Sequence, residues 1–257
     1  MLLIHGAWQG AWAWEAWLPE LQRLGWSASA IDLPGNGNDP ADRTPPGDVS
    51  LALYVEHAGR ALAALGGPAV VVGHSGGGIV ASQLGEAFPE RVAALVFVAG
   101  MMLPSGMSFR RLMAEAQAED PATDYAGIGP HLQWSADRQT SVVPAEAARA
   151  IFLHDCDPAA AAAAAARLRP QPERGRAMAP TLSAARHGQL PRLYVEARQD
   201  RSISLALQQR MQRLSPGARR LSLDCGHVPQ LALPRALAEG VCAELDALPC
   251  GPLPRLH

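Results

Sequence analysis

The sequence has few of the features that mark nucleic-acid, metal or membrane proteins. Charged residues make up 18% of the 257 residues, and the formal net charge is only −2, whereas charged residues are usually about a quarter of a globular protein. The sequence contains no basic run and no arginine-rich arm, so we expect no nucleic-acid partner. No apolar run reaches the length of a membrane span. None of the four cysteines lies in a C-x-x-C pair, so we expect neither a zinc site nor thioredoxin-like chemistry.

The cysteines and the start of the chain bear on location. Residues 1–4 are too short for the apolar region of a signal peptide and have no basic flank. A domain of this size with a large core does not depend on disulfides. We therefore expect reduced thiols and a cytoplasmic protein. The sequence is compatible with a homodimer but carries no signal that fixes the oligomeric state.

Hydrophobic residues, by contrast, are abundant at 48% and follow a regular order. Short apolar runs alternate with helical patterns, which is typical of βαβ units and a parallel sheet. We expect strands at residues 2–4, 27–31, 69–72, 92–98, 193–195 and 220–223. We expect helices at residues 12–24, 51–65, 76–88, 205–214 and 235–248. The sequence therefore predicts an α/β fold with a mainly parallel sheet of about six strands flanked by helices.

Between residues 101 and 190 this alternation stops, and no strand candidate stands out. An eight-alanine tract at 159–166 follows Asp157 and Pro158, which suit the N-cap and first turn of a helix. A stretch of this length is too long for a simple loop. We therefore predict a core of sheet and helices at 1–100 and 191–250, a helical lid inserted at 101–190, and a tail at 251–257.

The strongest chemical signal is the G-x-S-x-G motif at residues 73–77, with Ser75 at its centre. It lies between a buried strand and a helix, which is the setting of a nucleophile elbow. The sharp turn strains Ser75, and side chains at Gly73 and Gly77 would collide with neighbouring backbone. A strand–helix turn that only packs is the plainer alternative.

A serine nucleophile needs a base, and His227 has the right place for one. It follows the last strand, and its loop reaches the same edge of the sheet as Ser75. Asp200 follows the preceding strand and completes the order serine, acid, histidine. Glu196 and Asp224 compete with it, but the first lies within its strand and the second is only three residues from His227.

Two backbone N–H groups must also point at the developing oxyanion. Gly76, directly after the serine, is expected to supply one. The loop after the first strand contains Gly6, and we expect the N–H of Ala7 to supply the other.

The motifs of this chain resemble the α/β-hydrolase superfamily. The resemblance rests on the His5-Gly6-Ala7-Trp8 run, the turn at residues 32–37, the elbow at 73–77, and Asp200 with His227. It covers residues 1–100 and 192–248. Within the superfamily, the motifs resemble in particular the branch that holds plant methylesterases of the salicylate-binding type, plant hydroxynitrile lyases and related bacterial esterases. It implies the α/β-hydrolase fold and a Ser75–Asp200–His227 triad that needs no cofactor.

The lyases of that branch use a threonine in the first loop and a lysine just after the histidine. Here Gly6 and Val228 hold those positions, and neither can donate a side-chain hydrogen bond. We therefore expect a carboxylesterase that cleaves small, largely apolar esters. Hydroxynitrile lyase, thioesterase, lactonase or amidase activity, or a ligand receptor with weak turnover, remain alternatives.

The substrate pocket is expected between the sheet edge and the lid. Its candidate lining residues are Met101, Met102, Leu103, Phe109, Trp134 and Phe152, although each could equally serve as plain lid core.

Overall fold

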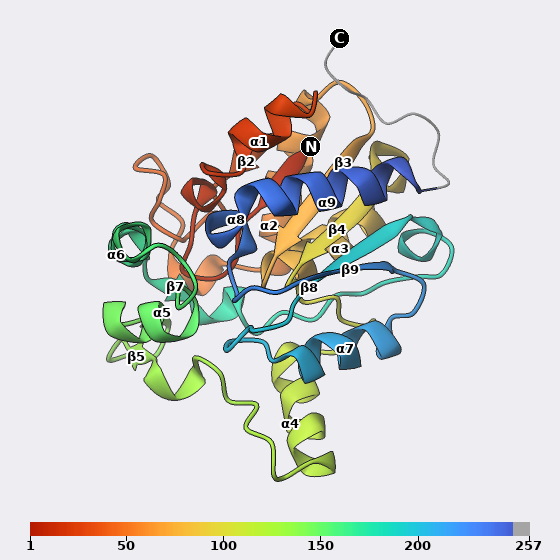
Figure 1. Cartoon of the computed structure of the whole chain (residues 1–257). Coiled ribbons are helices and arrows are strands. Elements are labelled where there is room, and N and C mark those ends of the chain that lie inside the picture. Colours follow the sequence, from red (N-terminus) through yellow and green to blue (C-terminus); the bar gives the residue numbers. More distant parts are fainter. Residues whose placement is uncertain (249–257) are drawn as a thin grey trace.

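The centre of the molecule is a six-stranded sheet (Figure 1). The computed structural model describes residues 1–248; the predicted tail at 251–257 and the last two residues of the predicted core lie outside the described residues. Every neighbouring pair of strands is parallel, in the order β2-β1-β3-β4-β8-β9. The strands are β1 (Leu2–Ile4), β2 (Ser29–Ile31), β3 (Ala69–His74), β4 (Val92–Val98), β8 (Arg192–Ala197) and β9 (Arg219–Leu223). The predicted parallel sheet is confirmed.

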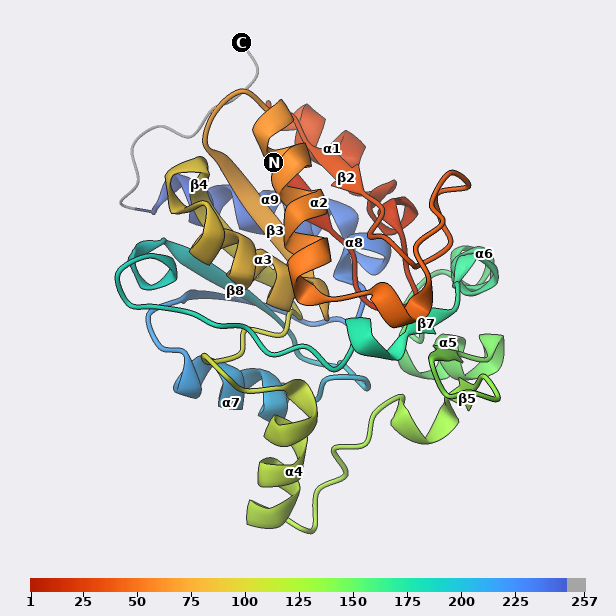
Figure 2. The same cartoon turned by 180° about the vertical axis from the view of Figure 1, so that it is seen from behind.

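Helices cover both faces of this sheet. Helices α1 (Leu18–Arg23), α8 (Pro229–Ala232) and α9 (Pro234–Asp246) lie on one side (Figure 1). Helices α2 (Leu51–Ala64) and α3 (Gly77–Ala87) lie on the other side (Figure 2). Helix α7 (Leu205–Leu214) follows β8 in the chain and lies beside that strand (Figure 2). Because both faces are covered, the central strands β3 and β4 are continuous apolar runs, apart from His74 at the end of β3, rather than alternating.

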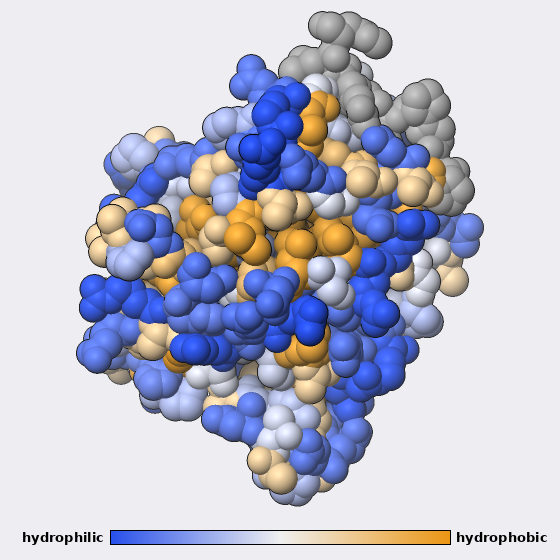
Figure 3. Space-filling view, viewed as in Figure 1, coloured by the Kyte–Doolittle hydropathy of each residue, from blue (hydrophilic) through white to orange (hydrophobic). Residues whose placement is uncertain are grey.

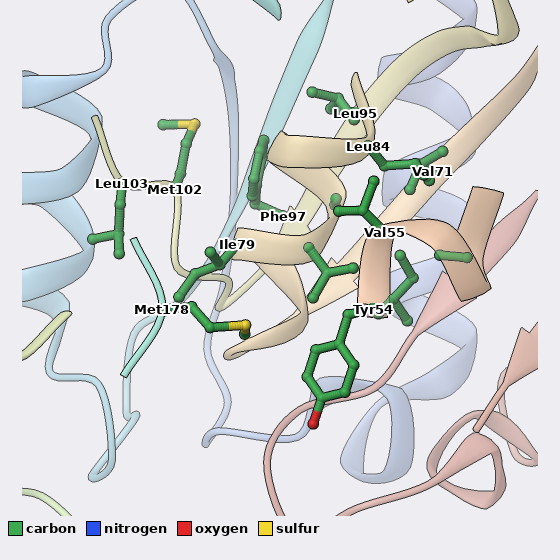
Figure 4. Close-up of a cluster of buried hydrophobic side chains, with 14 of the residues drawn as sticks. Tyr54, Val55, Val71, Ile79, Leu84, Leu95, Phe97, Met102, Leu103 and Met178 are labelled. Atoms are coloured by element: carbon green, nitrogen blue, oxygen red, sulfur yellow. The ribbon is translucent and has the colours of Figure 1, made fainter. Parts of the chain in front are cut away.

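The core on the α2–α3 side shows how the two layers meet (Figure 4). Val71 and Phe97 of the sheet, Ile79 of α3 and Tyr54 of α2 belong to one buried cluster. Its members lose nearly all contact with water, which is the main source of stability in such an interface. The Tyr54 hydroxyl points out of this cluster in Figure 4, toward the buried polar groups described below.

The segment predicted as one helix at residues 12–24 is instead two pieces. A 3-10 turn at Ala11–Trp14 is followed by a break and then by α1. Pro19 explains the break, because it has no N–H to donate and is tolerated only in the first turn of a helix, where it stands in α1.

The inserted segment at residues 101–190 is mixed rather than helical. It holds helices α4 (Phe109–Glu119), α5 (Ala145–Ile151) and α6 (Pro158–Arg167). It also holds a small antiparallel sheet of β5 (Gln133–Trp134), β6 (Thr140–Val142) and β7 (Gln171–Pro172). The expectation that this stretch has no strand was wrong, because strands of two or three residues are too short to show a period of two.

The alanine helix forms as the sequence predicts. Asp157 caps α6, and its Oδ1 accepts hydrogen bonds from the N–H groups of Ala159 and Ala160, both at 3.0 Å. These bonds satisfy two of the donors that a helix leaves open at its start.

Apolar side chains gather over α8 and the neighbouring part of α9 in the middle of one face, framed by hydrophilic residues (Figure 3). Within residues 1–248, no helix combines the length and the apolar character needed to cross a bilayer.

Candidate active site

Ser75 stands at the sharp turn between β3 and α3. Its φ is +49°, in the left-handed region that costs a residue with a side chain about 1 kcal/mol or more. A Cβ on Gly73 would lie 2.6 Å from the carbonyl oxygen of Gly77, and a Cβ on Gly77 would lie 2.6 Å from the carbonyl oxygens of Ile4 and His5. Both distances are far below contact. The expected strain at Ser75 and the need for glycine at both positions are therefore confirmed.

The carboxyl edge of the sheet brings Ser75, Asp200 and His227 together. Asp200 follows β8 and His227 follows β9, the two strands beyond β4. The Nδ1 atom of His227 lies 2.7 Å from Oδ2 of Asp200, and both side chains are almost fully buried. Ser75 and His227 line the same cavity.

Asp200 is held firmly by its own loop and by α7. Its Oδ1 accepts hydrogen bonds from the N–H groups of Ser202, at 2.7 Å, and Ile203, at 2.9 Å. Gln208 Nε2 donates to Oδ2 at 3.4 Å. These donors fix the carboxylate so that one oxygen faces the imidazole.

Neither of the two competing carboxylates is bonded to His227. Glu196 accepts hydrogen bonds from Gln212, at 2.8 Å, and Ser222, at 2.6 Å, while Asp224 is exposed. Of these three acids, only Asp200 contacts His227 in the part of the chain that the structure describes.

No hydrogen bond among residues 1–248 joins the Ser75 hydroxyl to His227. A contact of this kind is often long in an unliganded site and shortens when substrate binds. The geometry therefore presents a buried acid–histidine pair that opens on the serine.

The first loop lies directly against the nucleophile turn. A Cβ on Gly6 would lie 2.8 Å from Cβ of Ser75, so only glycine fits there. The Ala7 nitrogen lies 3.9 Å from the place of a Cβ on Gly76. The two expected oxyanion donors, the N–H groups of Ala7 and Gly76, are thus neighbours beside Ser75.

His74 and Gln9 also belong to the site, although neither was predicted as a site residue. His74 Nε2 donates to the backbone carbonyl of His227 at 2.8 Å, and its Nδ1 lies 2.9 Å from Oε1 of Gln9. Burial, together with the nearby His227, holds the pKa of His74 well below its usual range, so the ring is neutral. A neutral ring that donates through Nε2 must accept at Nδ1, and we therefore assign the Gln9 amide in the reversed orientation, with its NH₂ rather than Oε1 facing the ring.

The contacts of Gln9 with His74, and of His74 with the carbonyl of His227, hold the backbone of His227 in place. The ring of His74 lies 4.8 Å from the ring of His227, centroid to centroid.

The cavity in front of Ser75 encloses about 1070 Å³ of unfilled space, part of it open to solvent. Of the expected lining residues, Met101, Phe109 and Phe152 lie in its wall. Met102 and Leu103 are instead buried in the core cluster (Figure 4), and Trp134 lies beside Arg138 and Arg176 outside the cavity wall. Within the described part of the chain, no three histidine, cysteine or acidic side chains are grouped as metal ligands.

The model of the alpha/beta hydrolase family matches residues 1–240. The chain belongs to this family. A pyrethroid hydrolase of Sphingobium wenxiniae is 26% identical over 248 residues, covering 96% of this chain and 88% of that protein. Methylesterase 7 of Arabidopsis thaliana is 33% identical over 126 residues, which is less than half of either chain.

Solved structures of this α/β-hydrolase fold agree closely with the chain. A pyrethroid hydrolase from Sphingobium faniae superposes with a TM-score of 0.81 at 25% identity, and 96% of each chain is covered. A polyneuridine aldehyde esterase superposes with a TM-score of 0.79 at 21% identity, which speaks for the fold alone. The predicted family, fold and enzyme class are confirmed: this α/β hydrolase is an enzyme of the carboxylesterase type.

Proposed function

We propose that the protein cleaves carboxylic esters through a Ser75–Asp200–His227 triad. The observation that carries this proposal is the buried 2.7 Å contact between His227 and Asp200, which opens on the same cavity as Ser75. In this arrangement Asp200 accepts from Nδ1 of His227. The other ring nitrogen is then free to take the proton of the Ser75 hydroxyl.

The reaction follows the acyl-transfer route of such triads. The Ser75 oxygen attacks the ester carbonyl while His227 takes its proton, and the N–H groups of Ala7 and Gly76 stabilise the tetrahedral oxyanion. His227 then passes the proton to the departing alcohol, which leaves an acyl group on Ser75. A water molecule, deprotonated by His227, releases the carboxylic acid and restores the serine.

The cavity wall favours a substrate that is apolar around its carbonyl. Met101, Phe109, Met113 and Phe152 contribute apolar surface to it. Such a wall stabilises hydrocarbon groups by removing them from water. The names of the similar proteins point the same way, so pyrethroid and methyl esters belong in the first substrate panel.

The first loop disfavours a hydroxynitrile lyase. The lyases that the sequence resembles need a side-chain hydroxyl where this chain has Gly6, and a Cβ there would press on Ser75 at 2.8 Å. Val228, which stands in place of their lysine, is fully buried. Neither residue can handle cyanide or a cyanohydrin hydroxyl.

Hydrolysis of a short-chain nitrophenyl ester by the wild type and by Ser75→Ala tests the proposal. We expect kcat to fall by about 10⁴-fold or more in the variant, as for the loss of a triad nucleophile. Ser27→Ala, which changes an exposed serine, is the matched control and should keep full activity. Equal activity in wild type and Ser75→Ala would refute the proposal.

A further inference from the structure

Trp8, the residue after the proposed oxyanion donor Ala7, has an unusual backbone. Its φ is +62°, in the left-handed region that glycine prefers. A bulky residue in this region is strained by about 1 kcal/mol or more and stays there only when its surroundings hold it. The contacts of Trp8 therefore show what maintains the shape of the first loop.

All three polar groups of Trp8 are bound by the inserted segment. Its N–H donates to Oε1 of Gln171 at 3.0 Å, and its carbonyl accepts from the N–H of Arg169 at 2.9 Å. Its indole Nε1 donates to the carbonyl of Ser141 at 3.1 Å. The Arg176 guanidinium lies 4.8 Å from the indole ring centroid. The small sheet β5-β6-β7 and its neighbours thus hold the loop from outside the core.

Gln171 is itself oriented without ambiguity. A backbone N–H can only donate, so the Trp8 N–H requires the amide oxygen of Gln171 to face it. The same Oε1 also accepts from Nδ2 of Asn36 at 2.9 Å, and Tyr54 donates to Oδ1 of Asn36 at 3.2 Å. Gln171, Asn36 and Tyr54 are each at most 2% exposed. These buried groups therefore hold one another in a fixed orientation.

The core holds the peptide that carries the Ala7 N–H, through the carbonyl group of Gly6. The carbonyl of Gly6 accepts from Nδ1 of His5 at 2.7 Å, while His5 Nε2 accepts from the N–H of Leu33 at 3.0 Å. Burial lowers the pKa of His5, which keeps the ring neutral and this tautomer fixed. The Gly6 carbonyl and the Ala7 N–H belong to one trans peptide and point in opposite directions. His5 therefore fixes the peptide that carries the Ala7 N–H, and Gln171 fixes the next peptide.

We propose that Gln171 is a positioning residue that aims the Ala7 N–H at the oxyanion by holding Trp8. The inserted segment then does more than cover the cavity, because the oxyanion donor keeps its place only while β7 lies against the first loop. This inference rests on the proposed esterase function.

Gln171→Met tests the inference, since it keeps the length of the side chain and removes the acceptor. Gln133→Met is the matched control, because it makes the same change at an exposed position on β5. Activity on the nitrophenyl ester is counted per active site, with sites titrated by a phosphonate that labels the serine. Affinity for phenylboronic acid, whose tetrahedral adduct occupies the oxyanion position, is measured alongside.

We expect kcat of Gln171→Met to fall by about 10- to 100-fold, less than the 10²- to 10³-fold typical for complete loss of one oxyanion donor. KM should change by less than about threefold, and boronate affinity should weaken in step with kcat. Gln171→Glu keeps an acceptor for Trp8 and should recover most of the loss. Gln133→Met should match the wild type.

A merely structural role would lower the number of titrated sites and leave kcat per site and boronate affinity unchanged, which would overturn the inference. If Gln171→Met does not fold, Trp8→Phe serves instead, because it keeps an aromatic ring and both backbone hydrogen bonds but removes the Nε1 donor that binds Ser141. It should lower kcat per site by about 3- to 10-fold, and an unchanged value would again overturn the inference. Failure of the esterase function is distinguishable, since wild type and Ser75→Ala would then be equally inactive.

Discussion

The nucleophile turn and the first loop both hold a residue in the left-handed region, but by different means. Ser75 is held by backbone packed against backbone, with no room for a Cβ at Gly73 or Gly77. Trp8 is held by hydrogen bonds from a segment more than 130 residues away in the chain. A tightly packed turn fails as a whole, whereas a hydrogen-bonded loop can lose one partner and keep the fold. We therefore expect backbone changes in the nucleophile turn to lower stability, and the loss of a hydrogen bond to the first loop to lower kcat.

The largest effect comes from changing the chemistry while no backbone moves. Asp200→Asn keeps an oxygen for the N–H groups of Ser202 and Ile203 but presents an NH₂ to His227. The imidazole is then held in the wrong tautomer. We expect kcat to fall by about 10⁴-fold, with the free energy of unfolding within about 1 kcal/mol of wild type in urea titrations.

Asp224→Asn is the control for this change, because Asp224 was the nearest competing acid and is exposed. It should keep full activity. A large loss in Asp224→Asn, with a small one in Asp200→Asn, would move the acid to the other loop and contradict the assignment.

A change in the nucleophile turn should lower the stability of the fold. Gly77→Ala places a methyl group 2.6 Å from two carbonyl oxygens, and we expect it to lower the free energy of unfolding by about 3 kcal/mol or more. Gly67→Ala, where a Cβ meets no atom within 4 Å, should stay within about 0.5 kcal/mol of wild type. Urea unfolding of both variants measures the difference. If Gly77→Ala is as stable as the wild type and has a lowered kcat, the expected difference between the turn and the loop is contradicted.

The same contrast explains what the sequence could predict. The turn is encoded locally: a buried apolar strand, two glycines around a serine and a helix follow one another within about 20 residues, so Ser75 could be found without a structure. Asp200 and His227 could be found because the ends of parallel strands meet at one edge.

The support of the first loop could not be found in this way. Gln171 lies in a strand of two residues that ends in proline, and its partner Trp8 is 163 residues away. No periodicity or motif connects them. Leu103, expected in the cavity wall but buried in the core, shows the same limit, because an apolar residue after a strand serves core and cavity equally well.

The smallest predicted effect is a loss of stability toward acid pH, caused by the buried histidines that support the site. His5 supports the first loop and His74 supports His227, and burial lowers the pKa of both. The pKa of His187, in the inserted segment, is lowered to about 4. As the pH falls below about 6.5, the unfolded chain binds protons at these histidines and the folded chain does not, so stability is lost toward acid. The loss should approach about 2 kcal/mol at pH 5 for each histidine that stays neutral.

Urea unfolding between pH 6.5 and 5.0 measures this loss above the range in which carboxylates titrate. His5→Asn keeps a donor for the Gly6 carbonyl and removes one titrating group, so the pH slope of the free energy of unfolding should fall by about one proton. His131→Asn changes an exposed histidine and should leave the slope unchanged. Equal slopes in the two variants would mean that His5 binds its proton equally well in the folded chain. A neutral His5 would then no longer explain how the core holds the first loop.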